Sequence, residues 1–434
     1  MCIGRSASKG GGPGQGLENI IVASRICNSM DERRLHRLFS FGIALLFIPS
    51  IYTGFFPNKI TLISFLCGWM IILLFLHFRK MYDFSEFDGR RIFAIFVLFN
   101  VVMYIRGFFN IDSNTDIYAL ACSLFFLCFL IPAYMLLAQS ATLTEIWKCL
   151  LIPGAILCVI CYLYPSSDGM MTMAHNASFL NVFLLFIPFV SKKWRRRIIL
   201  AALVVALLDV DRRSILACTF FSLGLGMFAN IVLHKIVKTV FYWALILVPI
   251  ILFALGITGT FNIFQYMEDS YSYRARGGER DMFVDSRSAI YEDVFTELSE
   301  KDAIVWGLGG NGKTRTSLTE LKDANYAEKY KYGRPGTESG MLNYIQYGGL
   351  IGFLVYGLLL IVGSFRAVFK SNNRLMALIG LFVAFKFLFS FLEDRIGFQP
   401  ASFYLFLTIG MCYNVRLREM DDDEMTDYIQ QVFT

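Results

Sequence analysis

Two adjacent arginines, Arg212 and Arg213, carry the clearest chemical signal in this sequence, and they share a turn with Asp209 and Asp211. Arginine binds phosphate groups through paired N–H donors arranged as a planar fork. Charged groups that lie below a membrane surface are costly unless they face protein, water or a ligand. The turn therefore predicts a binding site for an anion such as a lipid diphosphate.

Two other cations, Arg106 and Lys386, could contribute to such a site, and a further arginine opens a predicted helix. Arg287 stands near the start of the segment 286–295, whose apolar residues recur at helical spacing. Arg106 lies near the end of one apolar run, and Lys386 lies inside another. Arg106 and Lys386 either add positive charge to the anion site or extend toward the membrane interface, and both alternatives stay open.

Glu338 is the first candidate for a general base, because it stands just before a long apolar run. The alternative is that Thr337 and Glu338 only cap the N-terminus of the helix that follows. His175, which precedes another apolar run, is a second candidate base.

Residues 307–314 read GLGGNGKT and match the G-x-x-x-x-G-K-T pattern of a nucleotide-phosphate loop. Such a loop follows a buried strand of an α/β domain, and no strand pattern precedes this one. We therefore expect the glycines to form a tight connection between two short helices.

The elements that must position these residues are membrane helices. Hydrophobic residues make up 56% of the chain, and they are gathered in runs separated by short basic turns. The sequence predicts an all-α polytopic membrane protein with about twelve transmembrane helices. The runs are 38–56, 60–78, 92–109, 117–138, 146–164, 179–190, 198–210, 215–233, 237–257, 340–363, 375–392 and 398–415.

Basic residues gather in the flanks 33–37, 79–91 and 192–197, which fall on one side of the membrane if every run spans it. Loops rich in lysine and arginine stay in the cytoplasm, so both termini are predicted to be cytoplasmic. The predicted organisation is a disordered cytoplasmic tail (1–35), helices one to nine (36–257), one large extracytoplasmic loop between helices nine and ten (258–337), helices ten to twelve (338–415) and a cytoplasmic tail (416–434).

Two neighbouring runs are short. The runs 179–190 and 198–210 offer about 18 Å and 16 Å of uncharged helix, against the roughly 30 Å of a bilayer core. Adjacent short helices suggest a funnel that opens outward.

Charge and cysteine content exclude several classes. The net charge of +6 follows from the basic turns, and no nucleic-acid motif accompanies it. None of the ten cysteines lies in 258–337, so a disulfide framework is not expected. Neither a metal nor another cofactor is predicted.

Taken together, these motifs resemble the superfamily of O-antigen ligases and Wzy-type polysaccharide polymerases. The resemblance is carried by the arginines after the short seventh run, the helix led by Arg287, the turn 306–312 reading WGLGGNG, and the segment 337–352, which opens with a polar triplet. It covers roughly residues 170–365.

The resemblance implies a metal-independent glycosyltransferase of the GT-C type in a bacterial inner membrane. Its substrates would be oligosaccharides linked to undecaprenyl diphosphate, as both donor and acceptor, with membrane lipid and a chain-length regulator as further partners. Arg213 (with Arg212) and Arg287 would hold the donor diphosphate. Ligases commonly carry a histidine where the loop returns to the membrane. This chain has Thr337, Glu338 and Ser339 there instead, so the resemblance favours a polymerase.

Two alternatives remain. A ligase of the same superfamily would transfer finished glycan to lipid A core. A transporter or flippase for a lipid-linked sugar would also have many spans, but transporters usually consist of two related halves with broken helices. Here one half holds the large loop and most of the recessed charges.

Overall fold

The computed structural model describes residues 86–120, 124, 126–139, 143–144, 146–148, 179–208, 213–257, 286–317, 333–393 and 400–433. These residues form helices and their connections. The helices are α4 (Arg90–Phe108), α5 (Asn114–Ala119), η5 (Phe126–Leu130), α6 (Ile131–Leu137), α9 (Leu180–Leu185), η6 (Ile187–Phe189), α10 (Lys192–Leu208), α11 (Arg213–Met227), α12 (Ala229–Val232), α13 (Lys235–Ile257), α15 (Ser286–Glu300), α18 (Gly340–Phe369), α19 (Arg374–Phe389), α20 (Pro400–Cys412), α21 (Val415–Glu419) and α22 (Asp422–Phe433).

Among the described residues, three helices are long and apolar enough to cross a membrane, namely α4, most of α13 and α18. Shorter apolar helices accompany them at Cys128–Leu137, Ser214–Met227 and Ser402–Cys412. This content agrees with the predicted helical membrane protein. The total of twelve spans stays a prediction, because the runs 38–56 and 60–78 lie outside the described residues.

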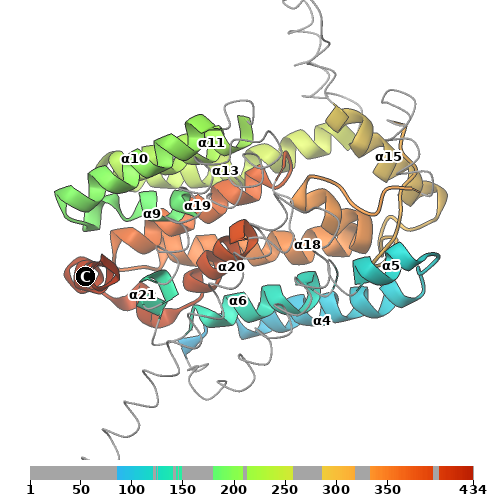
Figure 1. Ribbon diagram of the computed structural model, residues 1–434, viewed down its shortest axis with the longest axis horizontal. Helices are drawn as coiled ribbons and strands as arrows, with labels where there is room; N and C mark the ends of the chain where they lie inside the picture. Colours follow the sequence, from blue (N-terminus) through green and yellow to red (C-terminus); the bar gives the residue numbers. More distant parts are fainter. Residues whose placement is uncertain are drawn as a thin grey trace, which may run out of the picture.

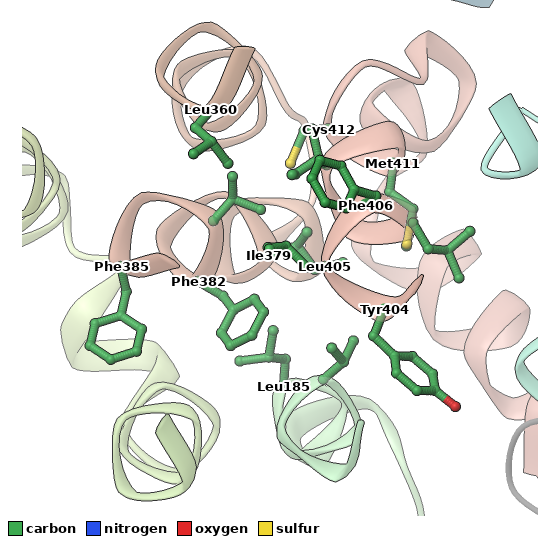
Figure 2. Close-up of a cluster of buried hydrophobic side chains, with 14 of the residues drawn as sticks. Leu185, Leu360, Ile379, Phe382, Phe385, Tyr404, Leu405, Phe406, Met411 and Cys412 are labelled. Carbon is green, nitrogen blue, oxygen red and sulfur yellow. The ribbon is translucent and has the colours of Figure 1, made fainter. Parts of the chain in front are cut away.

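The helices pack in three tiers (Figure 1). α18, α19 and α20 occupy the middle; α10, α11 and α13 lie on one side of them, and α4 and α6 on the other. The core where these tiers meet is apolar: Figure 2 shows Phe382 of α19 beside Leu185 of α9, and Leu405 of α20 in the same cluster. α19 is therefore surrounded by neighbours.

One face of α4 is apolar and exposed. Its outward residues follow each other at intervals of three or four, which is the spacing of one helix face. They are Ile95, Leu98, Val102, Ile105 and Phe109. A long exposed apolar stripe of this kind is typical of a surface that contacts lipid.

Charged contacts close the end of the bundle where the C-terminus lies (Figure 1). Arg418 Nη2 lies 2.8 Å from one carboxylate oxygen of Asp88, and Arg366 Nη1 lies 3.1 Å from the other. These contacts join the segment before α4 to the end of α18 and to α21. The helices α5 and α15 lie at the opposite end (Figure 1).

The helix that contains most of the seventh run is longer than the run itself. α10 begins at Lys192 and has 17 residues, so the basic flank 192–197 is part of the helix. Lysine and arginine are good helix formers, and their charged ends can stay exposed. α10 is thus about 25 Å long. The neighbouring run 179–190 is divided into α9, with six residues, and η6, with three, so neither helix is as long as the predicted run.

Candidate functional site

The last turn of α19 and the residues after it, 386–393, receive hydrogen bonds from the start of α18, and we call this segment the α19 junction. The carbonyl oxygen of Ser390 accepts from the Ser339 hydroxyl at 2.7 Å and from the Met341 amide at 2.9 Å. Both donors follow Glu338 closely in sequence. The candidate base is therefore attached to the α19 junction by the residues next to it.

α15 is attached to the same junction. The Tyr291 hydroxyl donates a hydrogen bond to the carbonyl oxygen of Phe391 at 2.6 Å. The ring of Phe253, from α13, lies 5.4 Å from the Phe391 ring and 6.2 Å from the Tyr291 ring. Arg287 precedes Tyr291 by four residues, and residues four apart share one helix face. α15, which begins next to Arg287, is thus attached to the α19 junction through Tyr291.

α11 forms the third contact. The Lys386 ammonium lies 3.8 Å from the Cys218 sulfur, and the rings of Phe221 and Phe385 stack at 3.8 Å. α11 begins at Arg213, five residues before Cys218, a rise of about 7.5 Å. The α19 junction therefore contacts each of the three helices that begin next to a predicted site residue.

Two predicted residues, Arg212 and His175, lie outside the described residues. Arg213 and Arg287 are described as parts of their helices, at the first and second positions of α11 and α15. Their roles in binding a diphosphate stay predictions.

Glu338 is exposed, with 70% of its side chain accessible, and it lies 3.6 Å from the guanidinium of Arg334. It does not cap α18. Ser339 is the capping residue, and its hydroxyl accepts from the Leu342 amide at 3.2 Å. The interpretation of Glu338 as a cap is therefore wrong; its carboxylate pairs with Arg334 instead and stays largely exposed.

α18 is broken where the glycine turn meets it. Gly349 has φ 59° and ψ −145°, a conformation that ends one helical segment and begins another. The carbonyls of Gln346 and Tyr347 lose their partners within the helix at this break. The amides of Leu308 and Gly309 replace those partners, at 2.8 Å and 2.9 Å.

The first backbone amides after the break in α18 also find hydrogen-bond partners in the turn. The amide of Leu350 donates to the carbonyl of Ile304 at 2.9 Å, and the amide of Ile351 donates to that of Val305 at 3.3 Å. Backbone groups inside a membrane must find partners within the protein. The turn 304–309 supplies both donors and acceptors, so it completes the broken helix.

Arg106 holds this turn in place. Its guanidinium donates to the carbonyl of Trp306 and, at 2.8 Å, to that of Gly307. The nearby Asn110 amide donates to the carbonyl of Gly310 at 2.8 Å. The guanidinium of Arg106 is thus directed at this turn. A role of Arg106 in binding a diphosphate stays a prediction.

Six of the eight backbone amides of 307–314 donate hydrogen bonds within the protein, which argues against a nucleotide-phosphate loop. The Gly310 amide donates to the carbonyl of Met103 at 3.2 Å. Lys313 binds the carboxylate of Asp116 at 2.9 Å. A phosphate loop needs free amides and a free lysine. Burial alone would raise the pKa of Asp116, but hydrogen bonds from Lys313 and other donors keep it below its ordinary value.

Glu297 fixes the segment that follows α15. Its carboxylate is buried, lies 2.8 Å from the Lys301 ammonium and accepts from the Arg315 amide at 3.1 Å. Burial would raise the pKa of Glu297; its hydrogen bonds with Lys301 and Arg315 outweigh this effect and lower the pKa. The carboxylate is charged at neutral pH and stabilises the path of the chain toward 317.

In the described part of the chain, no three histidine, cysteine, aspartate or glutamate side chains are grouped so that they could hold a metal ion. No protein-family model and no curated protein sequence matches this chain. The assignment of function therefore depends on the residue pattern and on the α19 junction.

Sequence reasoning missed Tyr291 and Ser390, which attach α15 and α18 to the α19 junction. One sequence feature could have pointed to each residue. Tyr291 follows Arg287 by one helical turn, and Ser390 is a polar residue near the end of the apolar run 375–392.

Proposed function

We propose that this chain is a polysaccharide polymerase, a membrane glycosyltransferase that joins oligosaccharide repeat units carried on undecaprenyl diphosphate. The observation that carries the proposal is the α19 junction. It contacts the helices that begin next to Arg213, Arg287 and Glu338, three predicted site residues that lie far apart in sequence.

The proposed reaction transfers a glycan from one lipid carrier to the end of another glycan. The bond between the anomeric carbon and the donor diphosphate breaks, and a glycosidic bond to an acceptor hydroxyl forms. Arg213 (with Arg212) and Arg287 neutralise the charge that builds up on the leaving diphosphate, an effect that is strongest at a preorganised site shielded from water. Glu338 takes the proton of the acceptor hydroxyl, with His175 as the second candidate.

This chemistry needs neither ATP nor a metal ion, because the sugar leaves with a diphosphate that is already activated. The proposal places the chain in a bacterial inner membrane with about twelve spans, a GT-C-like arrangement and both termini in the cytoplasm. The site then faces outward, where lipid-linked repeat units become available, and a chain-length regulator is a further proposed partner.

One observation bears on the transporter alternative, because broken helices such as α18 are common in transporters. In a transporter the ends of the broken helix face the substrate. Here Leu308 and Gly309 occupy the carbonyls on one side of the break, and Ile304 and Val305 occupy the amides on the other. The break in α18 is used for internal packing, which favours the polymerase.

Deleting the gene and weighing the lipid-linked and surface glycans by mass spectrometry tests the proposal. Loss of a polymerase leaves single repeat units on the lipid A core. Loss of a ligase instead leaves long polymer attached to undecaprenyl diphosphate. Loss of a flippase leaves single units that are still lipid-linked and protected on the cytoplasmic side. Either of the last two results would overturn the proposal.

A further inference from the structure

Three consecutive apolar side chains of the turn 304–309 are exposed on the protein surface. Ile304 is 52% exposed, Val305 48% and Trp306 63%. Large apolar side chains that gather on a surface usually mark a contact with another protein, a ligand or a membrane. The sequence alone assigns this turn to a large loop outside the membrane, so the exposure of these side chains needs an explanation.

The exposed side chains continue the apolar faces of two neighbouring helices. On α18, Leu350 and Leu354 are exposed and lie one helical turn apart on the same face. The amide of Leu350 donates to the carbonyl of Ile304 at 2.9 Å, so the turn lies directly beside this face. On α4, the exposed Ile105 precedes Arg106, whose guanidinium binds the same turn.

The position of the turn along α18 places it at membrane depth. Near the other end of this helix, Arg366 pairs with Asp88 at 3.1 Å. The helix rises about 24 Å from Leu350 to Arg366, whereas the hydrocarbon core of a bilayer is roughly 30 Å thick. With Arg366 at one edge of the core, Leu350 lies below the opposite edge, and a tilt of the helix would place it deeper.

α4 gives the same depth independently. It begins at Arg90, close in sequence to Asp88, and it runs away from the end of the bundle that Asp88 closes. The rise from Arg90 to Arg106 is again about 24 Å, and Arg106 donates to the carbonyls of Trp306 and Gly307. Two helices of opposite direction therefore place the turn at the same level.

The backbone of the turn is paired as membrane depth requires. The carbonyls of 304–307 accept hydrogen bonds from amides of α18 or from the Arg106 guanidinium, and the amides of Leu308 and Gly309 donate to carbonyls of α18. Unpaired backbone groups are costly in lipid, so irregular backbone is tolerated there only when the protein supplies the partners. An arginine near the edge of the core likewise needs partners such as carbonyls.

We propose that the turn 304–309 is a re-entrant element whose side chains Ile304, Val305 and Trp306 contact the acyl chains of the bilayer. The chain after α15 enters the lipid, completes the break in α18 and returns to begin α18 itself. Tryptophan is enriched near the membrane interface, where its indole has an apolar and a polar environment. This proposal does not depend on the polymerase activity.

Fluorescence of Trp306 tests the proposal, because its indole reports the depth of the turn. The chain has five tryptophans, so the emission of Trp306 is measured as the difference between the purified wild type and Trp306→Phe in liposomes. Phosphatidylcholine with brominated acyl chains should quench most of this difference emission, and aqueous iodide should quench little of it. Trp147→Phe is the control: Trp147 is buried, so its difference emission should respond to neither quencher.

A second variant tests the same contact through stability. Val305→Asp removes no buried side chain but places a carboxylate in lipid, which is costly, so its midpoint of thermal unfolding in liposomes should fall by several degrees. Thr296→Asp adds the same charge at an exposed position of α15 and should unfold close to the wild type. Stronger quenching of Trp306 by iodide than by brominated lipid, or an unchanged unfolding midpoint in Val305→Asp, would overturn the proposal.

Discussion

A Cβ atom on Gly307 would lie 2.5 Å from the backbone nitrogen of Gly349, although 42 positions of sequence separate the two glycines. Both have positive φ angles, 63° and 59°. This contact joins the glycine turn after α15 to the break in α18. The two motifs that carried much of the family resemblance are therefore one structural unit.

Alanine in place of either glycine is expected to destabilise the packing of the glycine turn against α18. Gly307→Ala and Gly349→Ala each combine a left-handed backbone with a side chain that meets backbone atoms, and strain of this kind costs on the order of 1–3 kcal/mol. Thermal unfolding in detergent should show both variants clearly less stable than the wild type. Gly224→Ala is the control, because a Cβ there meets nothing within 4 Å. If all three variants are equally stable, the close packing of Gly307 against Gly349 does not stabilise the fold.

Tyr291→Phe tests the attachment of α15. The substitution keeps the ring and removes the hydroxyl that donates to the Phe391 carbonyl, a loss of about 1 kcal/mol. Limited proteolysis of the folded protein should then cut 286–317 faster. Tyr428→Phe, in α22 near the C-terminus, should leave the cutting rate unchanged. If Tyr291→Phe is cut at the wild-type rate, this hydrogen bond does not hold α15 in place.

Glu338→Gln tests the general base. The side chain is exposed, so the substitution should leave the fold intact. Removing a general base typically costs about 10²–10⁴ in rate, and we expect the rate of polymer formation to fall in that range. Glu300→Gln, which changes another exposed glutamate, should polymerise normally. If Glu338→Gln forms polymer at the wild-type rate, Glu338 is not the general base, and His175 is the next residue to test.

Glu297 predicts a dependence of stability on pH. Its pKa in the folded protein lies below its ordinary value of 4.5, so its ionised form stabilises the fold. A group with a lowered pKa contributes fully above its unfolded pKa and loses that contribution as pH falls through the folded pKa. The free energy of unfolding of the wild type should fall between pH 7 and pH 3. In Glu297→Gln this fall should be smaller, because the contribution of the ionised Glu297 is already missing at pH 7. An identical acid profile in the variant would contradict this role.

Local patterns predicted a good part of this fold. The run 92–109 corresponds to α4, and the helical spacing in 286–295 corresponds to α15, whose Ile290 and Val294 are buried. Both predictions depend on side-chain periodicity, which is a property of the segment itself.

Features that depend on tertiary contacts could not be read from the sequence. The break at Gly349 exists because the turn 304–309 supplies its hydrogen bonds, and Arg106 is drawn to the carbonyls of the same turn. Likewise, Ser339 rather than Glu338 caps α18 because its hydroxyl also reaches the Ser390 carbonyl. In each case the partner lies far away in the chain.

The most direct test of the account uses purified protein in liposomes with undecaprenyl-diphosphate-linked repeat units as the only substrate, without nucleotide and with a metal chelator. The account predicts a ladder of longer lipid-linked glycans, released undecaprenyl diphosphate, and loss of the ladder in Arg213→Ala and in Arg287→Lys, because a point charge cannot replace a bidentate fork. A folded wild-type protein that moves the intact unit across the bilayer without forming a ladder, or a full ladder from both arginine variants, would contradict it.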